Sequence, residues 1–204
     1  MKNIGLFFGS FNPIHMGHLI LANYCLEYCK LDRVMFVVSP HNPFKDVKGL
    51  LPFDERYNMA SCALSQSDRM MAVDWEKNLS LPSYTAQTMR YLSSLETVED
   101  NIYNIIIGLD NFLNIEKWKD FDELFKYHLI VYPRGGQDKD KLFYKFAEQR
   151  NKLSLNNNLT FLYNAPLIDM SSTFIRNEVS EGRSISFYVP PVVENIIKRN
   201  KFYV

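Results

Sequence analysis

The stretch IGLFFGSFNPIHMGH, residues 4–18, joins a short apolar run to a polar turn and then to the start of a helical pattern. The near-continuous apolar run 4–8 predicts a strand that is buried on both faces, as in a parallel sheet. Gly9 and Ser10 allow the backbone to approach a ligand closely, and Pro13 fixes the turn before the helix. Ligands of open parallel sheets bind where such loops leave the carboxyl ends of strands. We therefore expect a binding site at this turn.

Two of the four histidines of the chain, His15 and His18, stand three residues apart where this helix begins. That spacing puts both rings on one face, and a helix N-terminus offers free N–H groups and a positive dipole end. The pattern predicts a phosphate site in which both imidazoles donate hydrogen bonds. A zinc pair is the alternative, but it needs a third ligand, and no carboxylate or cysteine stands nearby in the sequence. Two surface or half-buried histidines without a ligand are the structural alternative.

The alternation of apolar runs and helical spacing continues along the chain and predicts an α/β fold. We expect a doubly wound, Rossmann-like parallel sheet with helices on both faces and a small C-terminal helical part, about residues 165–204. The whole chain, 1–204, is expected to be a single domain. The other predicted strands are 34–39, 102–107, 128–132 and 159–163, and the predicted helices are 16–29, 54–66, 85–95, 120–126, 139–149, 172–181 and 190–199.

Composition excludes several classes of protein. In 204 residues, 23 basic side chains balance 23 acidic ones, so the chain is not expected to hold nucleic acid by net charge. No apolar run approaches the ~18 residues of a membrane span, so no membrane contact is expected. Three cysteines do not form a disulfide framework, which indicates a reducing, cytoplasmic location. Cys25 and Cys29 are interpreted as buried thiols, with a metal or redox pair as the alternative.

Two further loops carry polar residues where ligands are expected. After Met170, the consecutive hydroxyls of Ser171, Ser172 and Thr173 form an N-cap before a helical segment. Arg176 lies on the same helix face as Thr173. Paired with the first turn, these residues predict a second phosphate clamp, although a plain helix cap explains them by themselves. Gly108 and Asp110 end an apolar strand, where the carboxylate can accept from ribose hydroxyls or hold a metal. A glycine turn in which Asp110 caps a helix is the structural alternative.

The first turn, residues 9–18, resembles the G-x-F-x-P-x-H-x-G-H signature of the nucleotidyltransferase superfamily, and Ser172 to Arg176 resembles its S-T-x-I-R signature. Segments between them are similar to those of bacterial nicotinate-nucleotide adenylyltransferases. The P-S-Y-T-x-x-T segment matches residues 82–88, the I-G-x-D…W…E-L stretch 107–124, the R-x-x-M helix 56–59 and the Y-V-P…V ending 188–193. Residues 133–135 read Pro-Arg-Gly, near where that family has an Arg-Pro-Gly segment. Ser10 replaces the usual Gly or Ala, Asn12 stands where Asp is common, and only Lys45 remains of a P-H-K/R element.

This resemblance implies transfer of the adenylyl group of ATP to nicotinate mononucleotide, with Mg²⁺ carried by the ATP. The mononucleotide phosphate is itself the nucleophile and is largely ionised at pH 7, so no general base is needed. The residues that the resemblance assigns are, for catalysis, His15, His18, Lys45 and Arg176; for ATP, Gly9, Ser10, Phe11, His18, Gly108, Asp110, Ser172, Thr173 and Arg176; and for the mononucleotide, Ser10, Phe11, Lys45, Tyr84, Thr85, Trp118 and Arg134. No residue is assigned to a protein-bound metal.

The alternatives are a sister adenylyltransferase acting on nicotinamide mononucleotide or phosphopantetheine, and a non-catalytic nucleotide-binding module. If nicotinate mononucleotide is the acceptor, Trp118 is expected to stack on its pyridine ring. Backbone N–H groups near Tyr84 and Thr85 are then expected to select its carboxylate. Arg134 is expected either to reach substrate or to stay a solvated loop residue. The sequence leaves the oligomeric state open, a homo-oligomer included.

Overall fold

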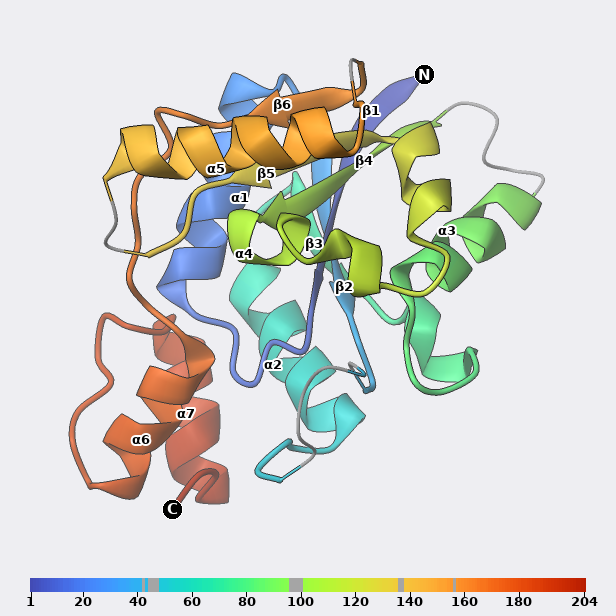
Figure 1. Ribbon diagram of the computed structural model, residues 1–204. Helices are drawn as coiled ribbons and strands as arrows, with labels where there is room; N and C mark the ends of the chain where they lie inside the picture. Colours follow the sequence, from blue (N-terminus) through green and yellow to red (C-terminus); the bar gives the residue numbers. More distant parts are fainter. Residues whose placement is uncertain (42, 44–47, 96–100, 136–137, 156) are drawn as a thin grey trace.

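Six parallel strands form the central sheet in the order β3-β2-β1-β4-β5-β6 (Figure 1). The computed structural model describes residues 1–41, 43, 48–95, 101–135, 138–155 and 157–204. This order is the Rossmann arrangement predicted from the alternating pattern. The strands are β1 (Lys2–Gly9), β2 (Arg33–Val38), β3 (Met70–Val73), β4 (Asn101–Gly108), β5 (His128–Tyr132) and β6 (Leu159–Phe161).

Helices cover both faces of the sheet, as expected for buried parallel strands. One face packs against α1 (Met16–Tyr28), α2 (Phe53–Leu64), α6 (Ser172–Ser180) and α7 (Pro191–Asn200). The other packs against α3 (Thr85–Ser94), α4 (Leu109–Phe112) and α5 (Lys139–Lys152), with the short 3₁₀ turns η3 (Ile115–Lys117) and η4 (Phe121–Lys126). The 3₁₀ turn η1 (Trp75–Asn78) follows β3.

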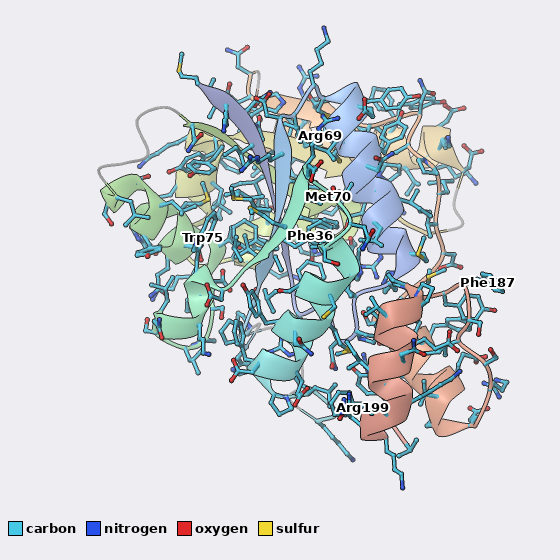
Figure 2. All side chains as sticks on the ribbon, turned by 180° about the vertical axis from the view of Figure 1, so that it is seen from behind. Phe36, Arg69, Met70, Trp75, Phe187 and Arg199 are labelled. Atoms are coloured by element: carbon cyan, nitrogen blue, oxygen red, sulfur yellow. The ribbon has the colours of Figure 1, made fainter. Side chains whose placement is uncertain are left out.

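Successive strand residues alternate between these two cores. In β1, Phe7 belongs to the core beneath α1 and α2, whereas Leu6 belongs to the core beneath α3 and α5. Phe36 in β2 is fully buried, with its ring centroid 5.4 Å from those of Phe7 and Phe11. Figure 2 shows Phe36 in the interior and Met70 on the edge strand β3. The core on the α1 side therefore continues from the sheet into the first turn.

The predicted elements form with small shifts of their ends, and one strand was missed. β3 is only four residues long, half-buried and at the sheet edge, so it lacks the buried apolar run that marks the other strands. The segment predicted as a helix at 120–126 is the 3₁₀ turn η4, and β6 ends at Phe161. None of the helices in the described part of the chain is long and apolar enough to cross a membrane. Cys25 is buried, and burial raises the pKa of its thiol and that of Cys29, as expected of core thiols.

The strand order places a crevice at the carboxyl ends of β1 and β4. The chain leaves β1 toward α1 on one face and leaves β4 toward α4 on the other, so the two loops diverge. Ligands of doubly wound sheets bind at this switch point. Figure 1 shows α6 and α7 at the same end of the sheet, and α7 contacts α2.

We expect Phe36→Ala to lower the free energy of unfolding by about 3–5 kcal/mol, because it removes a fully buried ring that supports both β1 and the first turn. Urea denaturation measures this loss. Met71→Ala is the matched control on edge strand β3: its side chain is 41% exposed, so we expect a loss below about 1 kcal/mol. Equal losses in both variants would contradict the assigned core.

Candidate active site

A cavity of about 410 Å³ opens where the first turn faces the N-terminus of α6. Strand β1 and the turn form one wall, α6 forms the opposite wall, and Arg134 with Tyr132 closes a side. The cavity brings together most of the residues predicted for ATP. Its described lining residues are Phe7, Phe8, Gly9, Ser10, Phe11, Asn12, His15, His18, Lys48, Leu50, Asn111, Tyr132, Arg134, Ser171, Ser172, Thr173 and Arg176.

The first turn bends back on itself immediately after β1. Phe11 has a left-handed backbone, with φ +45°, and its buried ring joins the core beneath α1. A Cβ at position 9 would lie 2.8 Å from the Phe11 ring, so only glycine fits there. The ring of Phe11 therefore serves packing, and what this residue offers the cavity is its backbone.

Side chains from outside the turn bind three of its carbonyl oxygens. Arg56 Nη1 donates to the Ser10 carbonyl at 2.7 Å, Arg176 Nη1 to the Asn12 carbonyl at 3.0 Å, and Ser172 Oγ to the Pro13 carbonyl at 2.9 Å. Carbonyl oxygens would repel a phosphate, whereas N–H groups attract it. The backbone N–H groups of Phe11 and Asn12 have no partner among the described residues. The turn therefore offers donors to an anion.

Arg56 is the most deeply buried cation of the site, although it does not line the cavity. Its side chain is 1% exposed, and its other hydrogen bonds go to the carbonyls of Ser39, Pro40 and Leu51 at 2.8–2.9 Å. Burial lowers its pKa to about 10, so it stays charged at neutral pH. This guanidinium joins the loop after β1, the loop after β2 and the start of α2.

The two histidines form a stacked pair at the start of α1. Their ring centroids lie 3.6 Å apart, and the N–H of His15, the N-cap residue, donates to Nδ1 of His18 at 3.2 Å. A neutral His18 ring that accepts at Nδ1 carries its proton on Nε2. Because His18 lines the cavity, this ring presents a hydrogen-bond donor to it.

His15 is buried and electrically neutral. It is 3% exposed, and burial, followed by the nearby charge of Arg134, lowers its pKa to about 3. Its Nδ1 is buried without a hydrogen-bond partner among the described residues. A Cβ at position 17 would lie 3.0 Å from this atom, so Gly17 gives the ring its space. His15 therefore contributes hydrogen bonding rather than positive charge at neutral pH.

The N-terminus of α6 forms the opposite wall through hydroxyls and one guanidinium. Ser171 is the N-cap, accepting from the Phe174 N–H at 3.1 Å, so the predicted helix cap is confirmed. Arg176 Nη2 donates to Thr173 Oγ1 at 3.3 Å, besides its bond to the first turn. Ser172 and Arg176 therefore tie the two signature segments together, 159 and 164 residues apart in sequence.

Gly108 and Asp110, both predicted for ATP, are not among the described residues that line the main cavity, whereas Arg134 is. Arg134 Nη1 lies 3.5 Å from Asp110 Oδ2, and both side chains are about half exposed. A Cβ at position 108 would lie 2.6 Å from Asp110 Oδ1 and 3.3 Å from the Tyr132 ring, so a larger residue there would displace the Asp110 carboxylate. Arg134 also lines a small adjoining cavity with His15, Gly17 and Met170, among others, so it is a wall of the site and not only a solvated loop residue.

The residues predicted for the mononucleotide are only partly brought together. Ser10, Phe11 and Arg134 line the main cavity, whereas Tyr84 and Thr85, at the start of α3, do not. Trp118 lines a separate cavity of about 30 Å³ with Phe8, Gly108 and Tyr132, among others. Lys119 Nζ lies 5.0 Å from the Tyr84 ring centroid, so the two segments are neighbours. The assignment to Lys45 lies outside the described residues.

Sequence reasoning missed Tyr132, Asn111 and Lys48, which line the main cavity. Tyr132 is 7% exposed and also lines both small cavities, so it stands where all three meet. Its place as the last residue of β5 is the signal that would have found it. Lys48 lies in a turn and Asn111 in the short helix α4, and neither position carries a comparable signal.

The described lining of the main cavity contains three cations, Lys48, Arg134 and Arg176, and no carboxylate. Such a lining suits a polyphosphate. It does not suit a protein-held Mg²⁺, which prefers carboxylate oxygens. No group of three or more His, Cys, Asp and Glu among the described residues is placed to bind a metal.

Comparison with known proteins agrees with this geometry. The cytidylyltransferase-like family model matches residues 6–178, which include the sheet, the first turn and the start of α6. The chain is thus a nucleotidyltransferase of this class. A solved structure titled as Plasmodium falciparum nicotinic acid mononucleotide adenylyltransferase complexed with NaAD shares the fold, with a TM-score of 0.76, 19% identity and coverage of 100% of this chain and 98% of that one.

Curated relatives carry the more specific name "Probable nicotinate-nucleotide adenylyltransferase". The protein from Cytophaga hutchinsonii is 40% identical over 98% of this chain and 97% of its own length. That from Porphyromonas gingivalis is 38% identical over 95% and 92%, and that from Clostridium acetobutylicum 35% over 100% of both chains. The chain belongs to the nicotinate-nucleotide adenylyltransferase family.

The low pKa of His15 makes the fold sensitive to acid. Its pKa is about 3 when folded against 6.5 ordinarily, so its stabilising contribution is complete above pH 6.5 and is lost as the pH falls toward 3. We expect the wild type to lose about 2 kcal/mol more of its unfolding free energy between pH 7.5 and 5 than His15→Gln, which cannot titrate. Urea denaturation at both pH values measures the difference. Parallel losses in the two proteins would contradict a buried neutral His15.

Proposed function

We propose that the chain transfers the adenylyl group of ATP to nicotinate mononucleotide, giving nicotinate adenine dinucleotide and pyrophosphate in NAD biosynthesis. The observation that carries this proposal is the cavity between the first turn and α6, which is lined by the turn, His18 and Arg176 and has no carboxylate among its described lining residues. The family membership supports the substrates, because relatives at 35–40% identity carry that name over nearly the whole chain.

The reaction forms one P–O bond and breaks another. A phosphate oxygen of the mononucleotide attacks the α-phosphorus of ATP, and the bond to pyrophosphate breaks. A phosphate monoester has a second pKa of about 6, so the nucleophile is already ionised at pH 7 and no base need remove a proton. The described lining residues, which include donors and cations but no carboxylate, match this requirement. Catalysis then consists of positioning for in-line attack and stabilisation of negative charge.

Residues on the two walls take different parts in this proposal. His18 donates from Nε2 to the phosphates of ATP, and neutral His15 supports it by stacking. Ser172, Thr173 and Arg176 hold the outer phosphates from the other wall. Mg²⁺ supplied with ATP, as part of the substrate, would neutralise phosphate charge. Gly9, Ser10 and Phe11 contribute backbone, and Gly108 with Asp110 borders the ribose.

In this proposal, the segments around Tyr84 and Trp118 bind the mononucleotide. Tyr84 and Thr85 begin α3, and no side chain in the described part of the chain caps its N-terminus, so its first N–H groups suit a carboxylate. Trp118, half-buried beside β4, offers its ring to the pyridine. Arg90 pairs with Asp120 and Glu123 at 2.7 and 2.6 Å and holds these segments together. Lys45 and Arg134 complete the proposal as phosphate partners.

We assign this reaction to the cytoplasm on the basis of the cysteines. Cys25, Cys29 and Cys62 are all free thiols, and Cys25 is buried in the core. Unpaired cysteines of this kind are usual in a reducing compartment.

Pyrophosphate release from ATP and Mg²⁺ tests the proposal, with nicotinate mononucleotide, nicotinamide mononucleotide and phosphopantetheine as parallel acceptors. We expect fast release with the acid and much slower release with the other two. Preference for the amide or for phosphopantetheine would make the chain a sister enzyme with the same ATP site. ATP binding without release from any acceptor would show a non-catalytic module. Either of these results would overturn the proposal.

We expect His18→Ala to lower kcat by about two to three orders of magnitude while the protein stays folded. The substitution removes a donor aimed at the phosphates, and loss of one such donor costs about 100- to 1000-fold. Steady-state pyrophosphate release measures the effect, and circular dichroism checks the fold. His128→Ala is the control, because His128 bonds Thr160 Oγ1 at 2.8 Å and lines none of the described cavities. Near-normal turnover of His18→Ala would remove His18 from the mechanism.

A further inference from the structure

The side-chain amide of Asn12 is a junction between three distant segments. Its Nδ2 donates to the Gly49 carbonyl at 2.9 Å, and its Oδ1 accepts from the Leu51 N–H at 3.3 Å. Oδ1 also accepts from the hydroxyl of Tyr203 at 2.8 Å, across 191 residues of sequence. An aspartate, the common residue here in the resembling family, has no donor for the Gly49 carbonyl. The amide is thus matched to this set of partners.

Tyr203 reaches Asn12 because the end of the chain folds back after α7. Lys201 and Tyr203 both have left-handed backbones, with φ +53° and +65°, and the Phe202 N–H donates to the Ile197 carbonyl at 3.1 Å. Residues with a Cβ are disfavoured in this region, so tertiary contacts must stabilise the bend. The ring of Tyr203 supplies such contacts by packing against the core on the α1 side.

The phenol of Tyr203 is a hydrogen-bond donor that stays neutral. Burial raises its pKa, while the charges of Arg176 and Arg56 lower it, which shows that it stands near both guanidiniums. These are the side chains that bind the Asn12 and Ser10 carbonyls of the first turn. The hydroxyl therefore contacts the first turn from the side away from the ligand space, and Tyr203 lines none of the described cavities.

We propose that Tyr203, which follows α7, is a positioning residue for adenylyl transfer. Its hydroxyl fixes the Asn12 amide, which in turn holds the 49–51 segment and keeps the Asn12 carbonyl in place for Arg176. The 48–50 segment brings Lys48 and Leu50 to the cavity. Without the hydroxyl, the wall formed by the turn and this segment loosens and ATP is held less well. This inference rests on the proposed function for its kinetic readout.

Tyr203→Phe tests this role by removing a single oxygen. We expect kcat/KM for ATP to fall about fivefold, and the ATP dissociation constant from titration calorimetry to rise about as much, as loss of one hydrogen bond implies. Tyr127→Phe is the matched control. Tyr127 is also half-buried, and its hydroxyl lies 2.9 Å from Ser93 Oγ. It precedes the first residue of β5, whereas the cavity lies at the last residue, Tyr132. We expect the two variants to lose similar thermal stability, while Tyr127→Phe keeps wild-type kinetics and ATP affinity.

A double-mutant cycle with Asn12→Ala distinguishes a positioning role of Tyr203 from a packing role. In Asn12→Ala the hydroxyl has no amide to hold, so adding Tyr203→Phe should cause no further loss of ATP affinity. Wild-type ATP affinity in Tyr203→Phe, or additive losses in the double variant, would overturn the inference. A lower melting temperature with unchanged kcat/KM would reduce Tyr203 to a packing residue and would equally overturn it. If the wild type releases no pyrophosphate, the proposed function fails, and the ATP affinities still decide on Tyr203.

Discussion

The structure of the site depends on the capture of backbone carbonyls by side chains from outside the first turn. Arg56, Arg176 and Ser172 bind the carbonyls of Ser10, Asn12 and Pro13. A tight turn exposes both donors and acceptors, and an anion is attracted only when the acceptors are engaged elsewhere. Because the carbonyls are occupied, the N–H groups and the His18 ring determine what the cavity binds.

Burial of Arg56 makes this arrangement electrostatically useful. Its described partners are all neutral carbonyls, at Ser10, Ser39, Pro40 and Leu51, so no carboxylate cancels its charge. Burial lowers its pKa to about 10, which still leaves it ionised at neutral pH. A chain whose 23 basic and 23 acidic residues balance thereby concentrates positive charge at one point. That is how a protein of no net charge can hold a polyphosphate.

Local patterns predicted the sheet and the two loops because their signals lie within short windows. Local sequence alone predicts three segments: the strand at 4–8, the turn after it and the helix start before Arg176. The contacts between them are different. The carbonyl partners of Arg56 lie up to 46 residues away, and Tyr203 lies 191 residues from Asn12, so no window contains both members. Phe11 shows the same limit, because the motif placed it at the site without indicating that its ring packs in the core.

Amide NMR during an ATP titration tests the account most directly. With ¹⁵N-labelled protein, Mg²⁺ and no acceptor, we expect the largest backbone shifts at Phe11 and Asn12, whose N–H groups have no partner among the described residues. Smaller shifts should follow at the start of α6, at Ser172 and Thr173. Large shifts confined to other parts of the chain, with the amides of the first turn unchanged, would contradict a phosphate site built by captured carbonyls.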